Sequence, residues 1–261
     1  MTLPDKATLI IGASGGIGQA LAQQLAEQGE SLVLCGRNQT ALAHLKANLA
    51  AQEKHTILVA DLTSVAGREA IVLAVSNAPI DTIINLAGTN QLSAFKRQTH
   101  ESIETTIHTN LTAIMLLIHD LIPLLETRSS STLVNVGSTL GAIGLPGYVT
   151  YCTSKFALRG FSEALSRELA DTAINVKYFA PRTTETSINS ARANAMNMEL
   201  GNKADSTQYV ANELIRFLAT EKESCHLGWP EKLFVKINSV LPSVVSKHLK
   251  TQLPIVRKYI G

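Results

Sequence analysis

The apolar positions of this chain follow two alternating patterns. Six short continuous apolar runs, rich in Val, Ile and Leu, are separated by longer stretches with apolar residues at helical spacing. The short runs predict strands buried on both faces, and the longer stretches predict helices. This alternation predicts an α/β fold, a doubly wound parallel sheet of Rossmann type. The predicted strands are Ala7–Ile11, Ser31–Cys35, Thr56–Ala60, Thr82–Asn85, Ser131–Val136 and Asn175–Ala180, and the predicted helices are Ile17–Gln28, Gln39–Gln52, Ala66–Val75, Glu101–Thr127 and Thr150–Asp171.

No linker, repeat or low-complexity stretch divides the chain. We expect one catalytic domain over residues 1–224, followed by an apolar and basic C-terminal extension over residues 225–261. Within the domain, residues 183–201 are polar and alanine-rich and contain Met196 and Met198. Flexible methionines suit a segment that adapts to varied apolar shapes, so we expect a mobile substrate lid there.

The predicted helix Glu101–Thr127 is unusual because its second half has almost no polar side. A helix that is apolar all round is buried all round. One side can face the sheet and the other then needs another subunit, so we expect a homodimer or homotetramer. The alternative is burial beneath the protein's own loops.

Charge and cysteine content narrow the range of partners. The 261 residues carry a formal net charge of +2 at pH 7, whereas nucleic-acid binding needs a concentrated basic face, so no nucleic-acid partner is expected. Cys35, Cys152 and Cys225 lack paired spacing, and the histidines do not cluster. We therefore expect no disulfide framework and no metal site. With no signal-peptide pattern before Ala7, we expect a cytoplasmic location.

A glycine-rich turn follows the first predicted strand, with the sequence Gly12-Ala13-Ser14-Gly15-Gly16-Ile17-Gly18. Glycines let backbone amides approach a pyrophosphate, and the N-terminus of the following helix adds partial positive charge. A tight strand-to-helix turn is the alternative, but the position at the first strand-helix junction favours dinucleotide binding. The expected cofactor contacts are Gly12, Ser14, Gly16, Ile17 and Gly18.

The end of the second predicted strand bears on which nicotinamide is bound. An NAD site usually has a carboxylate there for the ribose 2′-hydroxyl, whereas a 2′-phosphate is bound by an arginine. This chain has Arg37 and Asn38 at that point and no acidic residue. A guanidinium can bind a phosphate through two hydrogen bonds, so we expect NADP(H) rather than NAD(H).

A tyrosine and a lysine four residues apart occur in a later predicted helix. Tyr151 and Lys155 share one helix face, Ser138 lies thirteen residues before the tyrosine, and Asn110 lies in the long helix. In this order, and with the glycine turn, the chain resembles the short-chain dehydrogenase/reductase family over about residues 7–186. The resemblance implies an oxidoreductase whose catalytic residues are Asn110, Ser138, Tyr151 and Lys155.

The chemistry of these side chains supports the same activity. A phenol has a reference pKa of about 10, and a neighbouring ammonium lowers it, so Lys155 is expected to tune Tyr151. Ser138 would stabilise charge that develops on the substrate oxygen. Hydride then moves between nicotinamide and a carbonyl or alcohol carbon while Tyr151 exchanges a proton with the oxygen.

The resemblance also implies roles for other residues. Asn110 would hold a water that passes protons toward Lys155, which would also bind the nicotinamide ribose. Cys152 and Ser154 are expected to serve packing. The further cofactor contacts that the resemblance implies are Asp61 and Leu62 at the adenine, Asn85, Ala87 and Gly88 at the centre of the cofactor, and Pro181, Thr183 and Thr186 after the sixth strand.

The chain departs from the family's pattern at two positions. The usual Asn-Asn-Ala-Gly has Leu86 as its second residue, which should alter local packing only. The usual Pro-Gly near the nicotinamide has Arg182 in place of the glycine. This arginine could reach a substrate carboxylate or phosphate, or it could point to solvent.

The extension combines apolar residues with six Lys and Arg against Glu231 alone, a charge of +5. Pro242 and Pro254 divide it into helices of roughly ten residues, too short to span a bilayer. Such a segment can make peripheral contact with an anionic membrane or dock a partner. It can instead pack over the substrate pocket or a neighbouring subunit. In each case we expect an apolar substrate, an acyl chain being one option.

Together these patterns predict an NADP(H)-dependent carbonyl reductase for an apolar ketone or 3-oxoacyl compound. An alcohol dehydrogenase running toward the ketone would use the same residues, and a nucleotide-binding regulator without turnover would share the fold. The presence of Ser138, Tyr151 and Lys155 argues against the regulator. Cells keep the NADP(H) pool reduced, which argues for reduction.

Overall fold

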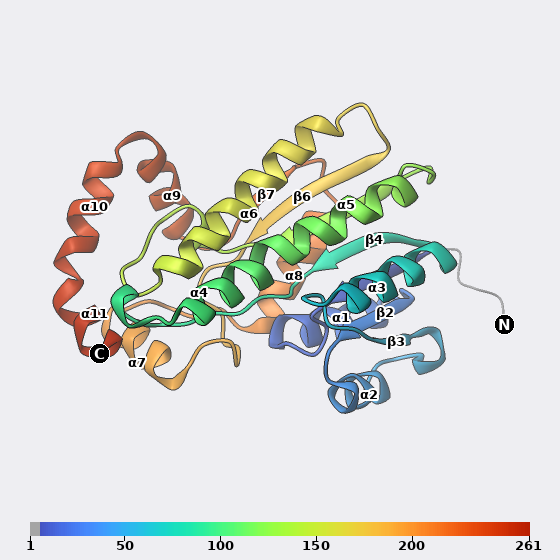
Figure 1. The fold of residues 1–261 in the computed structure, drawn as a ribbon, viewed down its shortest axis with the longest axis horizontal. Helices are drawn as coiled ribbons and strands as arrows, with labels where there is room; N and C mark the ends of the chain where they lie inside the picture. Colours follow the sequence, from blue (N-terminus) through green and yellow to red (C-terminus); the bar gives the residue numbers. More distant parts are fainter. Residues whose placement is uncertain (1–5) are drawn as a thin grey trace.

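Seven parallel strands form one sheet, in the order β3-β2-β1-β4-β5-β6-β7, in the computed structural model, which describes residues 6–261 (Figure 1). The order reverses between β1 and β4, and ligands of open α/β sheets bind at such a switch point. The predicted doubly wound fold is therefore confirmed. The strands are β1 (Ala7–Ile11), β2 (Leu32–Gly36), β3 (Thr56–Val59), β4 (Ile80–Asn85), β5 (Ser131–Val136), β6 (Ile174–Ala180) and β7 (Ser224–His226).

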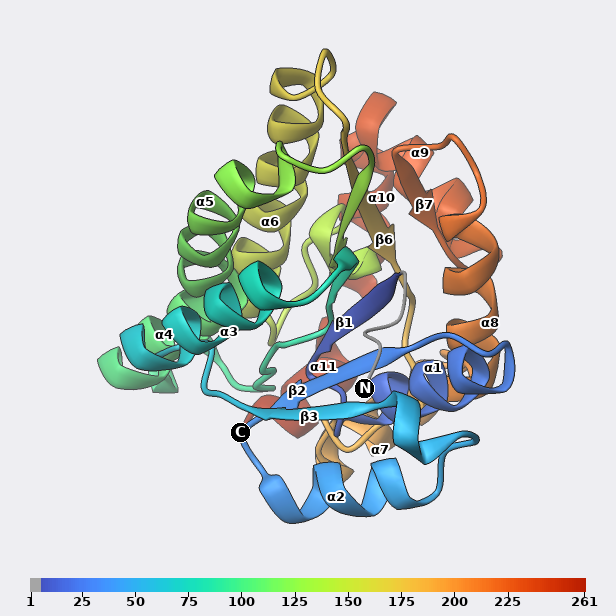
Figure 2. The same cartoon turned by 90° about the vertical axis from the view of Figure 1, so that its right-hand side faces the viewer.

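Helices cover both faces of the sheet, as right-handed crossovers between parallel strands require (Figure 2). One face is covered by α1 (Gly16–Glu27), α2 (Gln39–Ala47) and α8 (Thr207–Leu218). The other is covered by α3 (Val65–Asn77), α5 (Ala113–Leu125) and α6 (Val149–Glu168).

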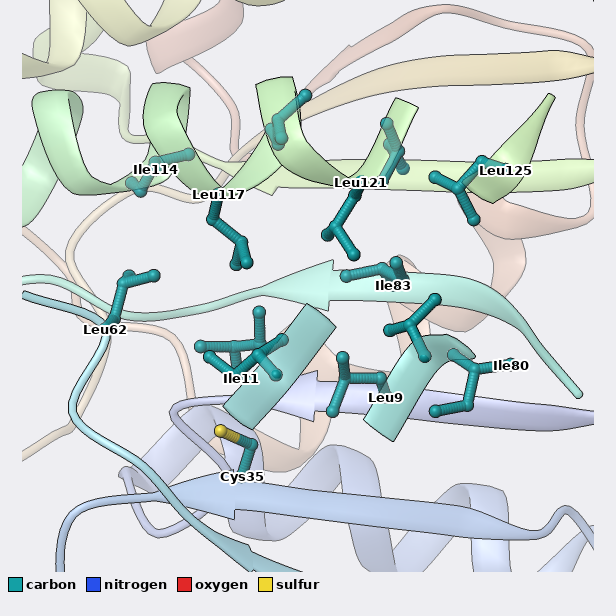
Figure 3. Packing of buried hydrophobic residues seen from close by; sticks show 14 of the residues in the cluster. Leu9, Ile11, Cys35, Leu62, Ile80, Ile83, Ile114, Leu117, Leu121 and Leu125 are labelled. Carbon is teal, nitrogen blue, oxygen red and sulfur yellow. The ribbon is translucent and has the colours of Figure 1, made fainter. Parts of the chain in front are cut away.

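Two hydrophobic cores result from the alternation of side chains along the central strands. In β1, Leu9 and Ile11 face α3 and α5, whereas Ile10 between them faces α1. Figure 3 shows the first core, in which Leu117 and Leu121 of α5 point down onto the sheet. Both cores exclude water from the strands that end at the cleft, so the loops leaving those strands start from fixed positions.

The two edge strands differ from the predictions. The predicted burial of both faces is wrong for β3, because it lies at the sheet edge and Thr56 and Val59 are exposed. Strand β7 was not predicted, since it has three residues and is recognisable only by its pairing with β6. The boundary predicted after residue 224 falls inside β7, and residues 1–5 of the predicted domain lie outside the described residues.

The predicted long helix is continuous in space but changes its winding. It consists of α4 (His100–Ile107), a π-helical turn (His108–Thr112) and α5. By length and composition the stretch His100–Leu125 could cross a membrane, but one side of it packs on the sheet as a core helix does. The other side is not buried in the single chain, because Met115 and Leu116 are 40% and 42% exposed.

The C-terminal extension packs against the catalytic domain beside α7 (Ala191–Glu199), as Figure 1 shows. It consists of α9 (Glu231–Val240), α10 (Pro242–Thr251) and α11 (Leu253–Ile260). Val235 and Val245 join a small core with Ile143, and Val256 packs with Met196 of α7. The extension thus packs over the substrate side of its own chain, as one of the predicted arrangements has it.

Candidate active site

A cleft of about 840 Å³ lies where the loops leave the carboxyl ends of the strands. It brings together most of the residues predicted to meet the cofactor or the substrate. Asn38, Asn85 and Asn110 are not among its lining residues. The predicted residues that do line it are Gly12, Ser14, Gly16, Ile17, Gly18, Arg37, Asp61, Leu62, Ala87, Gly88, Ser138, Tyr151, Lys155, Pro181, Thr183 and Thr186.

The glycine turn has the shape of a cradle for phosphate. Gly12 has a φ of +88°, and a Cβ there would lie 3.0 Å from the Ala87 nitrogen. A Cβ on Gly18 would overlap the Gly12 carbonyl, and a Cβ on Gly16 would lie 3.0 Å from the Thr186 methyl carbon. The N-cap of α1 is Gly15, so no side chain occupies the amides of its first turn. This backbone therefore fits a pyrophosphate at a helix N-terminus.

The end of the cleft predicted to meet the adenine carries the Asp61 carboxylate and the Arg37 guanidinium. Asp61 accepts hydrogen bonds from the Thr63 amide at 2.9 Å and from the Thr63 hydroxyl at 2.7 Å. Burial opposes the charged form, but these bonds and the charges of Arg37 and His108 outweigh it and hold the pKa of Asp61 below its ordinary value. Arg37 is exposed and lines the cleft, so its guanidinium is accessible to an anionic ligand.

Two of the predicted cofactor residues support the cleft from behind. Asn38 is the N-cap of α2, and its side-chain oxygen accepts from the Ala41 amide at 3.0 Å. Asn85 is buried at the end of β4, where its side-chain oxygen accepts from the Ala87 amide at 3.2 Å. Their side chains shape the loops that carry Arg37 and Ala87, and they do not themselves line the cleft.

Ser138, Tyr151 and Lys155 meet at the floor of the cleft. Helix α6 places Tyr151 and Lys155 on one face, and the Lys155 Nζ lies 5.9 Å from the centre of the Tyr151 ring. Ser138 follows β5, and its hydroxyl, which accepts a hydrogen bond from the Leu140 amide at 3.1 Å, lies close enough to Tyr151 to lower the pKa of the phenol. The Lys155 ammonium also donates to the Val136 carbonyl oxygen at 3.2 Å.

Burial shifts the pKa values of both α6 groups toward their neutral forms. It raises the pKa of Tyr151, an effect that the nearby Ser138 hydroxyl only partly offsets, and it lowers the pKa of Lys155 to about 8. The expectation that Lys155 lowers the pKa of Tyr151 does not hold, because burial of the phenol is the largest influence on that pKa and Lys155 is not among the charges that shift it. The phenol is protonated at neutral pH.

Asn110 lies in the π-helical turn and is fully buried. Its side chain accepts from the Thr89 amide at 2.8 Å and donates to the Thr89 carbonyl oxygen at 2.9 Å and to the Ser154 hydroxyl at 3.0 Å. A Cβ on Gly88 would lie 3.4 Å from the Asn110 Oδ1 and 3.5 Å from the Lys155 Nζ, so both groups flank this glycine. Ser154, expected to serve packing, is a hydrogen-bonding partner of Asn110.

Tyr178 supports the Ser138 loop from below and was not predicted. Its hydroxyl donates to the Ser138 carbonyl oxygen at 3.4 Å, and burial raises its pKa to about 12. Gly137 and Gly141 have no room for a Cβ because the Tyr178 hydroxyl occupies that space. The two glycines on either side of Ser138 were the available sequence signal for this close packing.

The outer wall of the cleft is largely apolar, and the sequence did not identify its residues. The loop after β5 and the C-terminal extension supply it together. The Phe234 and His248 rings stack at 6.2 Å between centres and 5° between planes, which joins α9 to α10 at this wall. The residues that form the wall are Leu140, Ile143, Leu145, Tyr148, Trp229, Pro230, Phe234, His248, Leu249 and Gln252.

Arg182 lines the cleft but does not have either of its predicted environments. Its guanidinium forms ion pairs with Asp205 at 2.7 Å and with Glu231 at 3.1 Å, and its side chain is 16% exposed. Two carboxylates satisfy it, so it faces neither solvent nor a free anion site. The prediction was wrong because both partners are distant in sequence.

The reversal of strand order, the glycine cradle and the Ser-Tyr-Lys set together define a dinucleotide-dependent oxidoreductase. The chain belongs to the short-chain dehydrogenase family. The model of this family, described as "short chain dehydrogenase", matches residues 6–197. The family predicted from the motifs is thus confirmed.

Similar proteins are found among both characterised sequences and solved structures. A rhamnolipids biosynthesis 3-oxoacyl-(acyl-carrier-protein) reductase of Pseudomonas aeruginosa is 34% identical over 188 residues, 69% of this chain and 73% of that protein. An NADPH-dependent pterin aldehyde reductase of Arabidopsis thaliana is 32% identical over 169 residues, 64% of this chain and 70% of that protein. A short-chain dehydrogenase from Sphingobium yanoikuyae, solved in complex with NADPH, is 26% identical with a TM-score of 0.78, covering 92% of this chain and 95% of that one.

Proposed function

We propose that this protein is an NADPH-dependent reductase of an apolar ketone or 3-oxoacyl compound. The observation that carries the proposal is the position of Ser138, Tyr151 and Lys155 between the glycine cradle and an apolar wall in one cleft. The cradle accounts for a dinucleotide, the three polar side chains for proton transfer, and the wall for an apolar substrate.

The assignment of NADP(H) rests on Arg37 and on the absence of an acidic residue at the end of β2. Arg37 would hold the 2′-phosphate, and the amides around Gly16 and Gly18 would hold the pyrophosphate. When bound, the reduced nicotinamide supplies the hydride. The Sphingobium yanoikuyae and Arabidopsis thaliana proteins, whose names include NADPH, support this choice.

In reduction, Tyr151 donates the proton that the substrate oxygen takes up. The phenol is protonated at neutral pH because burial raises its pKa, and this is the form that a general acid needs. Ser138 donates a hydrogen bond to the same oxygen and stabilises the charge that develops on it. Lys155 would bind the nicotinamide ribose and return a proton to Tyr151, and a water bound near Asn110 would relay that proton from solvent.

The substrate class follows from the wall. Phe234 and Leu249 are apolar, and Arg182, a cation that lines the same cleft, is paired with two carboxylates. Arg182 is therefore not available to an anionic group of the substrate. The reductase names of the relatives support the direction, and that of the Pseudomonas aeruginosa protein supports a 3-oxoacyl compound.

We further propose a homodimer or homotetramer in the cytoplasm. The exposed apolar side of α5, which includes Met115 and Leu116, supports contact with a second copy. Membrane contact through the extension is proposed as the second candidate, because Val240, Leu241 and Val244 are exposed among its lysines. Sedimentation of the purified protein tests the first, and flotation with anionic vesicles tests the second.

The reductase is tested by following NADPH consumption with a series of apolar ketones and 3-oxoacyl thioesters. Tyr151→Phe should lower kcat by about 10²–10⁴-fold, the contribution of a positioned general acid, while NADPH still binds. Tyr209→Phe is the matched control, because this tyrosine is exposed on α8 outside the cleft. Full activity of Tyr151→Phe would exclude the proposed mechanism. Binding of NADPH without turnover of any ketone would instead favour the nucleotide-binding regulator.

A further inference from the structure

Arg182 connects three segments that meet at the substrate side of the cleft. It follows β6, in the loop that also carries Thr183 and Thr186. Asp205 precedes α8, and Glu231 is the first residue of α9 in the C-terminal extension. A single guanidinium therefore joins the cofactor side of the cleft to the extension.

The contacts of this arginine are directional on both sides. Toward Asp205, Arg182 Nε donates to Oδ2 at 2.9 Å and Nη2 donates to Oδ1 at 2.7 Å, a two-bond fork. Toward the extension, Nη1 donates to both Glu231 carboxylate oxygens, at 3.2 and 3.1 Å, and to the Trp229 carbonyl oxygen at 3.4 Å. The Asp205 arm fixes the guanidinium plane, and the Glu231 arm holds the start of α9 against it.

The backbone on both sides of the guanidinium is built to bring these groups together. Asp205 is 8% exposed, its amide donates to the Thr183 carbonyl oxygen at 2.9 Å, and its own carbonyl oxygen accepts from Glu185 at 2.9 Å. In the extension, Gly228 has a φ of +91°, and a Cβ there would lie 2.5 Å from the Arg182 Cδ. Gly228 thus lets the chain pass directly over the arginine side chain.

We propose that Arg182 is a positioning residue that clamps the start of α9 to the cofactor-side loop and so fixes the apolar wall formed by Trp229 and Phe234. The wall is then held at a set distance from the reacting end of the cleft. If the proposed function holds, the clamp favours compact apolar ketones that touch the wall, and this consequence rests on that function. The clamp on α9 can be tested without enzyme turnover.

Two variants release the clamp in different ways. Glu231→Ala removes the extension arm and leaves the Arg182–Asp205 pair intact, so the fold is retained. Arg182→Gly restores the residue usual in the family and removes both arms. Glu213→Ala is the matched control, because Glu213 pairs with Arg216 at 2.7 Å on α8, where that arginine is 70% exposed. If Arg182→Gly fails to fold because Asp205 is left buried and unpaired, Glu231→Ala alone still tests whether the clamp holds α9.

The first measurement is the rate of trypsin cleavage after Lys232, which is exposed one residue beyond Glu231. Release of the start of α9 should speed this cleavage roughly tenfold, the effect expected when a charge-assisted hydrogen bond is lost. Thermal unfolding of Glu231→Ala should stay within a few degrees of the parent, since α9 to α11 keep their packing on Ile143 and Met196. Cleavage of the control variant should be unchanged.

The second measurement is steady-state reduction of a compact ketone. Both clamp variants should raise KM roughly tenfold while kcat changes little, because Ser138 and Tyr151 are untouched. Parental cleavage rates and KM values in both variants would overturn the clamp. Faster cleavage in a protein that reduces no ketone would uphold the clamp and overturn the proposed function.

Discussion

Replacement of Asn110 by alanine tests whether this side chain holds the site together. The Asn110 amide is the partner of both the Thr89 N–H and the Thr89 carbonyl, at 2.8 and 2.9 Å, in a fully buried position. Alanine leaves these two backbone groups without partners, and each such loss costs about 1–3 kcal/mol. We expect the free energy of unfolding to fall by roughly 2–5 kcal/mol. For a chain of this size, Tm should then fall by roughly 5–15 °C.

The assay is thermal unfolding followed by circular dichroism, with Ser154→Ala as the matched variant. That change removes one partner of Asn110 but leaves both Thr89 bonds, so it should cost only about 1 kcal/mol. NADPH binding is measured in parallel, well below the unfolding temperature of each variant. If Asn110→Ala melts within about 2 °C of the parent yet loses reductase activity, anchoring is refuted, and the residue acts on the chemistry itself.

Three further predictions concern the lysine, the cofactor arginine and the glycine cradle. Because the pKa of Lys155 is about 8, kcat/KM for ketone reduction should fall as the pH rises through about 8 and the ammonium is lost. A pH-rate profile that stays level to about pH 10 would contradict the catalytic role proposed for the Lys155 charge. The stability of the fold should depend on pH in the opposite direction. Between pH 8 and 10.5 Lys155 is protonated in the unfolded chain but not in the folded one, so the free energy of unfolding should rise with pH in this range. Lys155→Met should remove that rise in a denaturant titration. Arg37→Asp should weaken NADPH binding roughly 10- to 100-fold and improve NADH binding in a fluorescence titration. The control Arg167→Gln, on the exposed side of α6, should change neither affinity. If Arg37→Asp binds NADPH as tightly as the parent protein does, the cofactor assignment is overturned. Gly12→Ala and Gly29→Ala both place alanine at positive φ, so both variants should lose about 1–2 kcal/mol of stability. Only Gly12 lacks space for a Cβ, so only Gly12→Ala should also lose NADPH binding. Loss of binding in both variants, or in neither, would contradict the role of the glycine turn as a phosphate cradle.

The central strands and the motif residues could be predicted because their causes are local. Strands β1 and β5 begin and end at the predicted residues, since burial on both faces requires a continuous apolar run. Tyr151 and Lys155 share a face because helical geometry places residues four apart side by side. The switch point then follows from the alternation of strands and helices.

The rest depends on contacts between segments that are far apart in sequence. Arg182 meets Asp205 and Glu231, which lie 23 and 49 residues away, and no periodicity marks such a meeting. Strand β7 exists only because β6 offers its edge. The pKa of Tyr151 depends on how completely α6 and the extension bury the phenol, which spacing along the chain does not encode.

The wall of the cleft divides the chain into two parts with separate evolutionary freedom. The residues predicted to contact the nucleotide lie between Gly12 and Thr186, within the residues that match the family, whereas much of the wall lies between Trp229 and Gln252, beyond that match. Apart from Glu231, which Arg182 ties to the loop after β6, mutation of the second part can change the wall without disturbing the predicted nucleotide loops. A variant library over residues 229–252 that keeps Glu231 therefore samples new walls against a constant cofactor background, and it is a natural starting point for directed evolution of the proposed reductase.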